Sequence, residues 1–554
     1  MATFQEEKSS QRVDALRRKE EEEVTKLLAQ RYRLPYADLS KFPVEIEAIK
    51  ILPEESARAG ELAVVQTTGK RAVVVLRNPE SPPTKTIIKR LEEDGYVLEQ
   101  YVVSKDSLLH AWQFYKKAPE KKVTEAGTLE INHERIAELE KQFTSIRQVK
   151  ETISSTSVTR ASEALETIIA GALAVEASDV HVEPQQDDIR IRFRLDGMLY
   201  DILAITPRLY HLLLSRIKLV SELKLNIHDR AQDGRFTIRT KTTAIEVRTS
   251  TLPGPKGENV VMRILNPSSI EVAFEDLGMQ SWTTAIMAKE LDRPNGMILT
   301  TGPTGSGKTT TLYTFLRKIH SSEIKIITIE DPIEYHLPGI EQTQVNAEHG
   351  YDFANGLKSI VRQDPDVILV GEIRDFETAE IAMHAALTGH LVFSTLHTND
   401  ASGTIPRLID LGVKPPIMAP ALNISMAQRL VRKLCPHCRE AKTLTDEEKK
   451  AIAKDIASFP PGIPIPDQTK WQIFSAREGG CEFCHFTGYK GRVGVFEIIM
   501  IDAAIERLIM EKPAEYEIKN EALKQGQMTM KQDGILKMIA GVTSPEEIKR
   551  ILGE

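Results

Sequence analysis

A strand, a glycine-rich turn and a helix follow one another in residues 297–316, MILTTGPTGSGKTTTLYTFL. The turn holds the pattern G-x-x-x-x-G-K-[ST] between Gly302 and Thr309. Its glycines let backbone N–H groups turn inward around an anion, and the start of the following helix adds its dipole. The alternative is a glycine-rich turn that matches the pattern by chance. Such a turn would have no reason to stand between an apolar strand and a helix, as this one does. The segment therefore predicts a nucleotide-phosphate site in an α/β fold.

The alternation of strand and helix continues from about residue 280, which predicts a doubly wound, mostly parallel sheet. In the loop, Lys308 can reach the terminal phosphates of ATP, and the Thr309 hydroxyl can ligate Mg²⁺. The predicted nucleotide-binding residues are Gly302, Pro303, Thr304, Gly305, Ser306, Gly307, Lys308, Thr309 and Thr310.

Three more apolar strands each end near a titratable side chain. Glu330 follows IITI, Glu372 follows VILVG, and His397 follows LVFSTL. Because the carboxyl ends of parallel strands line one edge of a sheet, we expect these groups to meet the phosphate loop. A strand-end histidine can also be purely structural, but its place beside the other two strands favours a role for His397 in the site.

A nucleotide hydrolase needs one carboxylate to orient and deprotonate water and another to hold the hydrated metal. We predict Glu330 as the base. Thr309 is predicted to ligate Mg²⁺ and Glu372 to hold it directly or through water, with Asp331 as a further candidate. Gly371 stands where most P-loop ATPases have an aspartate, so a non-catalytic, nucleotide-gated scaffold is an alternative.

Four segments together resemble the signature motifs of the secretion-superfamily ATPases, the motors of type IV pilus assembly and type II secretion (the PilB/GspE family). These segments are GPTGSGKTTTLY, TIEDPIEY, RQDPDVILVGEIRD and TGHLVFSTLHTNDA. The resemblance covers roughly residues 135–500. It implies a RecA-like P-loop catalytic domain, preceded by a PAS-like α/β module and a small α/β N-terminal module, with a zinc-binding insertion.

The resemblance also implies residue roles. Glu330 would be the catalytic glutamate and Glu372 would act on Mg²⁺ and water, although the division of work between the two stays open. His390 and His397 would couple the site to a neighbouring subunit.

Arginine usually meets the charge that develops on the transferred phosphate. The catalytic domain offers Arg362 and Arg374, and the resemblance implies that Arg248 and Arg263 of the preceding module approach the phosphates when the two domains close. Lys358 stands where the family usually has arginine and is left out of the catalytic set, whereas Arg362 stays a secondary candidate. The preceding module also carries Arg235 and, on a strand whose alternation is typical of a solvated charged face, Arg190, Arg192 and Arg194.

The only four cysteines form two C-x-x-C pairs, Cys435/Cys438 and Cys481/Cys484. Four thiolates from two such turns can close a tetrahedron around structural Zn²⁺ without an open position for catalysis. A redox role for one pair is an alternative, but the presence of two pairs favours zinc. The resemblance implies that the metal pins a subdomain that docks on a membrane partner.

Net charge is −7 with the signs interspersed, which is unlike the basic surface of a nucleic-acid translocase, the rival interpretation. No apolar run reaches the ~18–20 residues of a membrane span, and the N-terminus lacks the apolar stretch of a secretory signal. We therefore expect a cytoplasmic protein, associated with the inner membrane through protein partners. The expected organisation is a charged helical segment (1–32), an N-terminal α/β docking module (33–115), a linker (116–134), the arginine-bearing module (135–275) and the ATPase domain (280–554) with its cysteine segment (430–490) and a helical C-terminal region.

The resemblance implies a homo-hexameric ATPase motor that powers type IV pilus assembly, with type II secretion as the alternative. Its partners would be a polytopic inner-membrane platform protein and cytoplasmic ring components. An assembly motor is favoured over a retraction motor, because retraction motors of the family commonly lack the N-terminal module and the zinc segment. Cyclic-di-GMP binding is not expected, since residues 10–32 lack the Arg-Leu-Gly motif that introduces it in some members.

Overall fold

In the computed structural model, the chain divides into two compact units, residues 1–124 and 125–554. Each unit is considered by itself. The first twenty residues and most of the predicted linker (116–134) lie outside the described residues. The structure describes residues 21–39, 44, 46–49, 51–68, 71–93, 95–117, 128–129, 143, 146–155, 161–186, 188–239, 243–267, 271–467 and 471–553.

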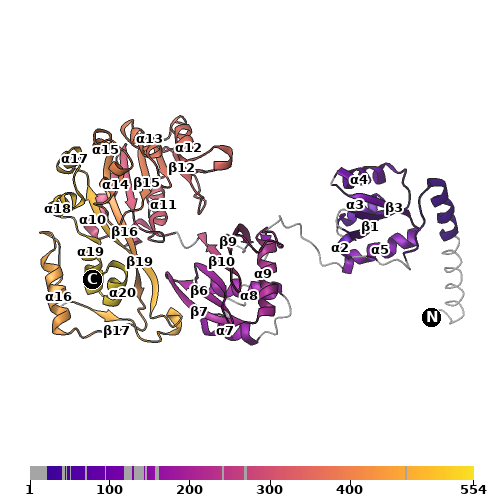
Figure 1. Cartoon of the computed structure of the whole chain (residues 1–554), viewed down its shortest axis with the longest axis horizontal. Helices are drawn as coiled ribbons and strands as arrows, with labels where there is room; N and C mark the ends of the chain where they lie inside the picture. Colours follow the sequence, from indigo (N-terminus) through magenta and orange to yellow (C-terminus); the bar gives the residue numbers. More distant parts are fainter. Residues whose placement is uncertain are drawn as a thin grey trace. The chain divides into compact units, whose positions relative to one another are not determined.

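The first unit is a small α/β fold with its own core (Figure 1). Its sheet has the order β1-β2-β3, antiparallel between β1 and β2 and parallel between β2 and β3. Residues 21–32 are helical, and the Glu22 carboxylate accepts a hydrogen bond of 2.7 Å from the Ser104 hydroxyl. The elements are α2 (Ile46–Ile49), α3 (Glu54–Ala59), β1 (Leu62–Thr68), β2 (Arg71–Leu76), α4 (Pro82–Glu93), β3 (Val97–Val102) and α5 (Lys105–Lys117).

The second unit begins with the arginine-bearing module, whose seven strands have the order β4-β8-β9-β10-β5-β6-β7. In β6 the sequence IRIRFRL alternates, so the aliphatic and aromatic side chains enter the core while the arginines stay outside it. The module consists of β4 (Thr128–Leu129), α7 (Ile146–Ser155), α8 (Ala161–Ala174), β5 (Asp179–Pro184), β6 (Ile189–Leu195), β7 (Met198–Ile205), α9 (Pro207–Val220), β8 (Gln232–Arg239), β9 (Ala244–Gly254) and β10 (Gly257–Leu265).

The P-loop domain is built on a second seven-stranded sheet with the order β13-β12-β14-β15-β11-β16-β19. Every neighbouring pair is parallel except β16 and β19, which are antiparallel. This is the doubly wound, mostly parallel sheet predicted from the sequence. Its strands and first helices are α10 (Ser281–Leu291), β11 (Gly296–Thr301), α11 (Lys308–Ile319), β12 (Ile326–Glu330), β13 (Glu341–Gln344), α12 (Phe353–Val361), β14 (Val367–Val370), α13 (Phe376–Leu387), β15 (Leu391–Leu396), α14 (Thr404–Asp410), α15 (Pro415–Ala421), β16 (Leu422–Leu434) and β19 (Tyr489–Met500).

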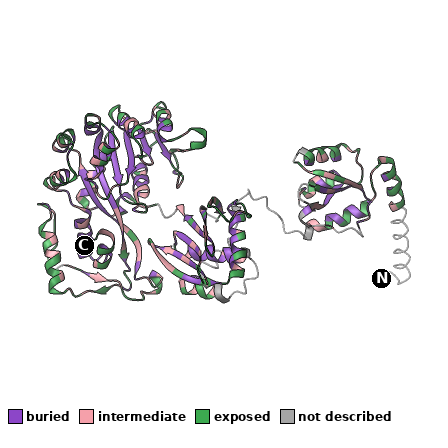
Figure 2. Ribbon diagram, in the orientation of Figure 1, coloured by how far each residue is buried: buried purple, intermediate pink, exposed green. Residues whose placement is uncertain are grey.

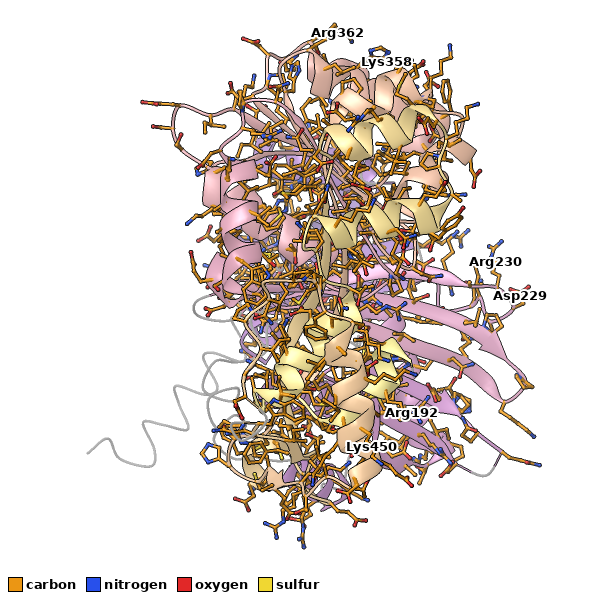
Figure 3. All side chains as sticks on the ribbon, turned by 90° about the vertical axis from the view of Figure 1, so that its left-hand side faces the viewer. Arg192, Asp229, Arg230, Lys358, Arg362 and Lys450 are labelled. Atoms are coloured by element: carbon orange, nitrogen blue, oxygen red, sulfur yellow. The ribbon has the colours of Figure 1, made fainter. Side chains whose placement is uncertain are left out.

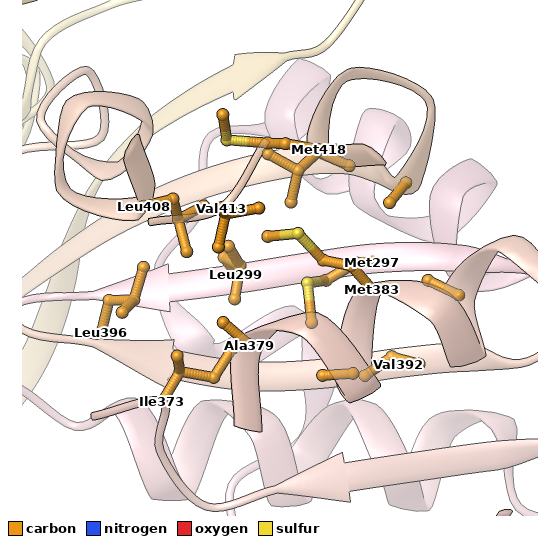
Figure 4. Close-up of a cluster of buried hydrophobic side chains, with 14 of the residues drawn as sticks. Met297, Leu299, Ile373, Ala379, Met383, Val392, Leu396, Leu408, Val413 and Met418 are labelled. Carbon is orange, nitrogen blue, oxygen red and sulfur yellow. The ribbon is translucent and has the colours of Figure 1, made fainter. Parts of the chain in front are cut away.

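Helices cover both faces of this sheet, so its central strands β11, β12, β14 and β15 are buried throughout (Figure 2). Met297 and Leu299 of β11 belong to the cluster that holds Met383 of α13, which Figure 4 shows in close-up. Ile298, between them in sequence, belongs to the other cluster, with Phe315 of α11. The alternation along β11 therefore holds the P-loop strand from both sides.

The strands β16 and β19 run on from the sheet as a long hairpin whose far end carries the four cysteines. Helices α19 and α20 pack on this hairpin through a separate apolar cluster that includes Val431, Val495 and Ile535. The remaining elements are β17 (Glu440–Ala441), α16 (Asp446–Ala457), β18 (Phe474–Ser475), α17 (Ala503–Met510), α18 (Glu515–Lys524), α19 (Met530–Ile539) and α20 (Pro545–Leu552). Among the described helices, none has the length and apolarity needed to cross a bilayer.

Candidate nucleotide and metal sites

The loop between β11 and α11 has the backbone that its glycines allow. Gly302, Gly305 and Gly307 have φ angles of +144°, +78° and +91°, which disfavour any side chain. A Cβ on Gly302 would lie 2.5 Å from the Gln428 carbonyl oxygen. The Lys308 ammonium group donates to the carbonyl oxygens of Gly302 (2.7 Å) and Pro303 (3.2 Å), so the lysine lies across its own loop.

A cavity of about 680 Å³ opens over this loop, a volume within the usual range for small-molecule sites. Residues Thr304–Thr310 line it, together with Glu330, Glu372 and His397 from three strand ends. Asp331 and Glu334 also line it. The loop and the three strand ends that the sequence singles out thus share one cavity.

Glu330, at the end of β12, is buried and held by three donors. It accepts hydrogen bonds from the Thr328 hydroxyl (2.6 Å), the Gln342 side-chain amide (3.2 Å) and the Tyr313 hydroxyl. Burial, together with the charge of Glu330, raises the pKa of Tyr313 well above its usual range, so the phenol remains a donor. These contacts fix the orientation of the carboxylate at the cavity wall.

Glu372 follows β14 and faces His397, which follows β15. The Glu372 carboxylate lies 2.5 Å from the Arg374 guanidinium and 3.5 Å from Nε2 of His397. His390 comes directly before β15 and therefore lies at the opposite edge of the sheet, where its Nδ1 is 2.9 Å from the Ala385 carbonyl oxygen. The two histidines of the predicted coupling pair thus lie at opposite ends of one strand.

The ionisable groups in the cavity influence one another. Burial lowers the pKa of Lys308, against the opposing effect of Glu372 and Glu334. Burial also raises the pKa of Glu334, while the positive charges of Arg248 and Arg263 oppose that rise. The site brings cations and carboxylates together in a partly desolvated space, as a phosphate-and-metal site requires.

Two arginines of the preceding module line the cavity on its other side. Arg263 donates from Nε to Asp179 (3.1 Å), and Arg194 lies 3.2 Å from the same buried carboxylate. Arg194 therefore lies at the site, although its strand pattern favoured a solvated face. Arg248 donates to the Ile333 carbonyl oxygen (2.5 Å), which ties the module to the acidic segment after β12.

The other candidate cations lie elsewhere. Arg192 pairs with Glu183 at 2.6 Å. Arg362 caps the C-terminus of α12 at the outer end of the domain, near Lys358, as Figure 3 shows. Both lie outside the residues that line the cavity, as do Arg190 and Arg235.

Two arginines line the cavity without having been predicted. Arg492 comes from β19 and Arg550 from α20, close to the end of the chain. Neither belongs to a nucleotide-binding motif. The sheet places Arg492 near the P-loop, and the packing of α20 places Arg550 there. No local pattern in the sequence marks them.

The four cysteines gather at the end of the hairpin, with all four sulfur atoms within 4.8 Å of one another. Sulfur–sulfur distances are 3.7 Å for Cys435–Cys481 and 3.8 Å for both Cys438–Cys484 and Cys481–Cys484. Zinc–sulfur bonds of about 2.3 Å in a tetrahedron require sulfurs about 3.8 Å apart. The donor set and its spacing therefore fit one tetrahedral thiolate-bound ion.

Backbone amides support this thiol cluster. The N–H groups of Cys481 and Gly488 donate to the Cys484 sulfur at 3.1 and 3.2 Å. Burial alone would raise the pKa of Cys484, but these donors outweigh it and bring the pKa to about 7. His437 and His485 lie outside the four-sulfur group.

A family model described as "Type II/IV secretion system protein" matches residues 155–550, well over half of the chain. The chain belongs to this family. The resemblance inferred from the four sequence segments is therefore confirmed.

Relatives of the chain carry names from both pilus assembly and secretion. The chain is 37% identical over 536 residues to the Type IV pilus assembly ATPase PilB of Myxococcus xanthus, covering 96% of this chain and 91% of that protein. It is 44% identical over 387 residues to the Type II secretion system protein E of Aeromonas hydrophila, covering 70% of this chain and 74% of that protein. The crystal structure of the pilus retraction motor PilT with bound ADP is 28% identical, covering 69% of this chain and 95% of that one, with a TM-score of 0.46.

Proposed function

We propose that this chain is a motor ATPase that hydrolyses ATP to ADP and phosphate and powers type IV pilus assembly. One observation carries the chemistry: the P-loop, Glu330, Glu372 and His397 line a single cavity. The family supports the assignment, since the relatives in both machines include proteins named as ATPases.

Each residue of the cavity has a defined task in this proposal. The loop N–H groups and Lys308 bind the phosphates, and Glu330 orients and deprotonates the attacking water. The Thr309 hydroxyl and the Glu372 carboxylate are the oxygen donors that Mg²⁺ prefers, so they would hold it. When bound, Mg²⁺ neutralises charge on the phosphate oxygens. Arg374 and His397 keep the Glu372 carboxylate oriented.

Arg263 and Arg194 supply positive charge from the preceding module, and Arg248 holds that module against the segment after β12. We propose that the module closes on bound ATP, because its arginines then approach the phosphates, and reopens after hydrolysis. Zn²⁺ in the four-cysteine cluster would have a structural role only, since four thiolates leave no open coordination position.

Pilus assembly is favoured over type II secretion by the extent of the similarity. The PilB relative aligns with 96% of this chain, whereas the secretion relative aligns with 70%. Secretion stays the second candidate, because the aligned part is more similar there, 44% against 37%. In either machine we propose a homo-hexamer that acts on a polytopic inner-membrane platform protein and its cytoplasmic ring.

The substitution Glu330→Gln tests the chemistry. It keeps the size and one acceptor oxygen but removes the base, so kcat should fall by about 10²–10⁴-fold while ADP affinity is retained. Phosphate release and ADP titration measure the two quantities, and the exposed Glu323→Gln serves as the matched control. Equal rates for wild type and Glu330→Gln would defeat the enzymatic assignment.

Disruption of the gene in its host separates the two machines. Loss of surface pili with unchanged export of secreted proteins is the expected result. Loss of export with intact pili would instead assign the chain to type II secretion. DNA-stimulated phosphate release that falls steeply with salt would favour a nucleic-acid translocase.

A further inference from the structure

The last helix of the chain, α20, borders the nucleotide cavity. Arg550 and Ile551 of this helix line it, together with Leu430 of β16 and Arg492 of β19. In the strand order, β16 and β19 lie on one side of the P-loop strand β11, whereas β12, β14 and β15 lie on the other. The C-terminal residues thus face the predicted acidic residues across the loop.

This arrangement separates the two halves of a bound nucleotide. The terminal phosphates belong beside Lys308, Glu330 and Glu372, so the nucleoside must extend away from these strand ends. Leu430 of β16 packs beside Gly307, just before α11. A Cβ on Gly307 would lie 3.3 Å from the methyl carbons of Leu430. The Arg429 guanidinium donates to the Ile551 carbonyl oxygen at 2.9 Å, which holds α20 against β16. Leu430 and Ile551 thereby form an apolar wall on the nucleoside side.

A fully buried carboxylate fixes the orientation of Arg550. Glu547 accepts from Arg550 Nε at 2.8 Å and from Nη2 at 2.5 Å, a two-point contact along one edge of the guanidinium. The remaining nitrogen, Nη1, points away from Glu547 because the guanidinium is planar. The same carboxylate accepts from Arg432 Nη2 at 2.7 Å. Glu547 is therefore held by two arginines, Arg432 of β16 and Arg550 of α20, and cannot turn without breaking both contacts.

We propose that Arg550 contacts the nucleoside half of bound ATP and that Glu547 is its positioning residue. The inference rests on the proposed function, that the cavity binds ATP. A guanidinium plane can stack on a base and bond a ribose hydroxyl, and its fork loses little freedom once it is anchored. The apolar wall beside it suits the base.

The test compares two ligands that share the phosphates but not the nucleoside, ADP and tripolyphosphate. In the full-length protein, Arg550→Gln should weaken ADP binding about tenfold, the loss expected for one hydrogen bond to a charged group. Tripolyphosphate binding should not change. The matched control is Glu546→Gln on the same helix, whose partner is Lys442, away from the cavity.

Two further variants test the positioning role. Glu547→Gln should weaken ADP binding to a similar extent, and the double variant with Arg550→Gln should be no weaker than Arg550→Gln alone, because Glu547 acts through Arg550. Additive losses would overturn the positioning role. Unchanged ADP affinity in Arg550→Gln, or equal losses for both ligands, would overturn the nucleoside contact. If wild type binds neither ligand, the proposed function itself fails.

Discussion

The Thr309 hydroxyl is proposed to ligate Mg²⁺. The side chain lines the cavity directly after Lys308, at the start of α11. If it ligates Mg²⁺ as proposed, removing the hydroxyl should weaken the metal without changing the loop.

We expect Thr309→Val to need about tenfold more Mg²⁺ for half-maximal phosphate release, because one oxygen donor is lost at constant volume. Thr309→Ser keeps the oxygen and should behave like wild type. Titration of Mg²⁺ at fixed ATP measures the effect. The same Mg²⁺ requirement in the valine and serine variants would exclude Thr309 as a ligand.

At the level of single residues, the sequence predicted which side chains at strand ends line the cavity. Glu330, Glu372 and His397 each come directly after an apolar run, and parallel pairing brings the ends of such runs together. Arg194 was missed because its alternation with Ile191, Phe193 and Leu195 matches an exposed strand face equally well. Whether such a face meets solvent or another domain depends on tertiary packing, which alternation does not encode.

Helix α20 contains a buried ionic contact. Its Glu547 is fully buried and bonded to Arg432 and Arg550, and these contacts lower its pKa to about 2 despite burial. A carboxylate with a depressed pKa stabilises the fold above its unfolded pKa, 4.5, and this contribution is lost as pH falls toward the folded value.

Glu547→Gln should therefore lower the Tm most at neutral pH. The difference from wild type should shrink between about pH 5 and about pH 2, since protonation removes the same charge from wild type. Thermal unfolding followed by circular dichroism measures this, with the exposed Glu506→Gln as control. A Tm difference that stays constant with pH would show that the charge of Glu547 contributes no stability.

The cysteine end of the hairpin depends on a different bond. We expect one equivalent of zinc per chain by elemental analysis, and loss of that zinc in Cys481→Ser, because three thiolates bind the ion less well than four. The Tm of Cys481→Ser should be lower than that of wild type, because the variant loses its zinc. Ser475→Ala, on the neighbouring strand β18, is the control. Full zinc content in the serine variant would rule out Cys481 as a ligand.

At the scale of the whole molecule, the first unit has a core of its own, separate from those of the P-loop domain and the arginine-bearing module. Leu76→Asp places a charge in that core, where Leu76 is fully buried, and should unfold the first unit. Phosphate release per chain should stay near the wild-type rate, because none of the described residues that line the cavity belongs to this unit. If the second unit of the variant is folded but phosphate release is lost, the nucleotide site depends on the first unit and the prediction fails.

The P-loop domain followed most directly from the sequence, since its strands and helices largely alternate from α10 to β15. The cavity did not follow as easily, because it is assembled from β10, the P-loop, three strand ends and α20. These elements come from distant parts of the chain, and only their packing shows which side chains share a space. Sequence therefore predicted the P-loop half of the site far better than the half supplied by other elements.

The hairpin of β16 and β19 has a mechanical consequence. Its thirteen-residue strand begins inside the sheet beside the P-loop strand and ends one residue before Cys435. Pairing with β11 ends at Ala427, so seven residues, 428–434, run on beyond it. At about 3.4 Å per residue this arm is roughly 24 Å long, so a tilt of about 10° at the sheet displaces the far tip by roughly 4 Å. A small rotation at the phosphates would thus become a displacement of several ångströms at the cysteine end.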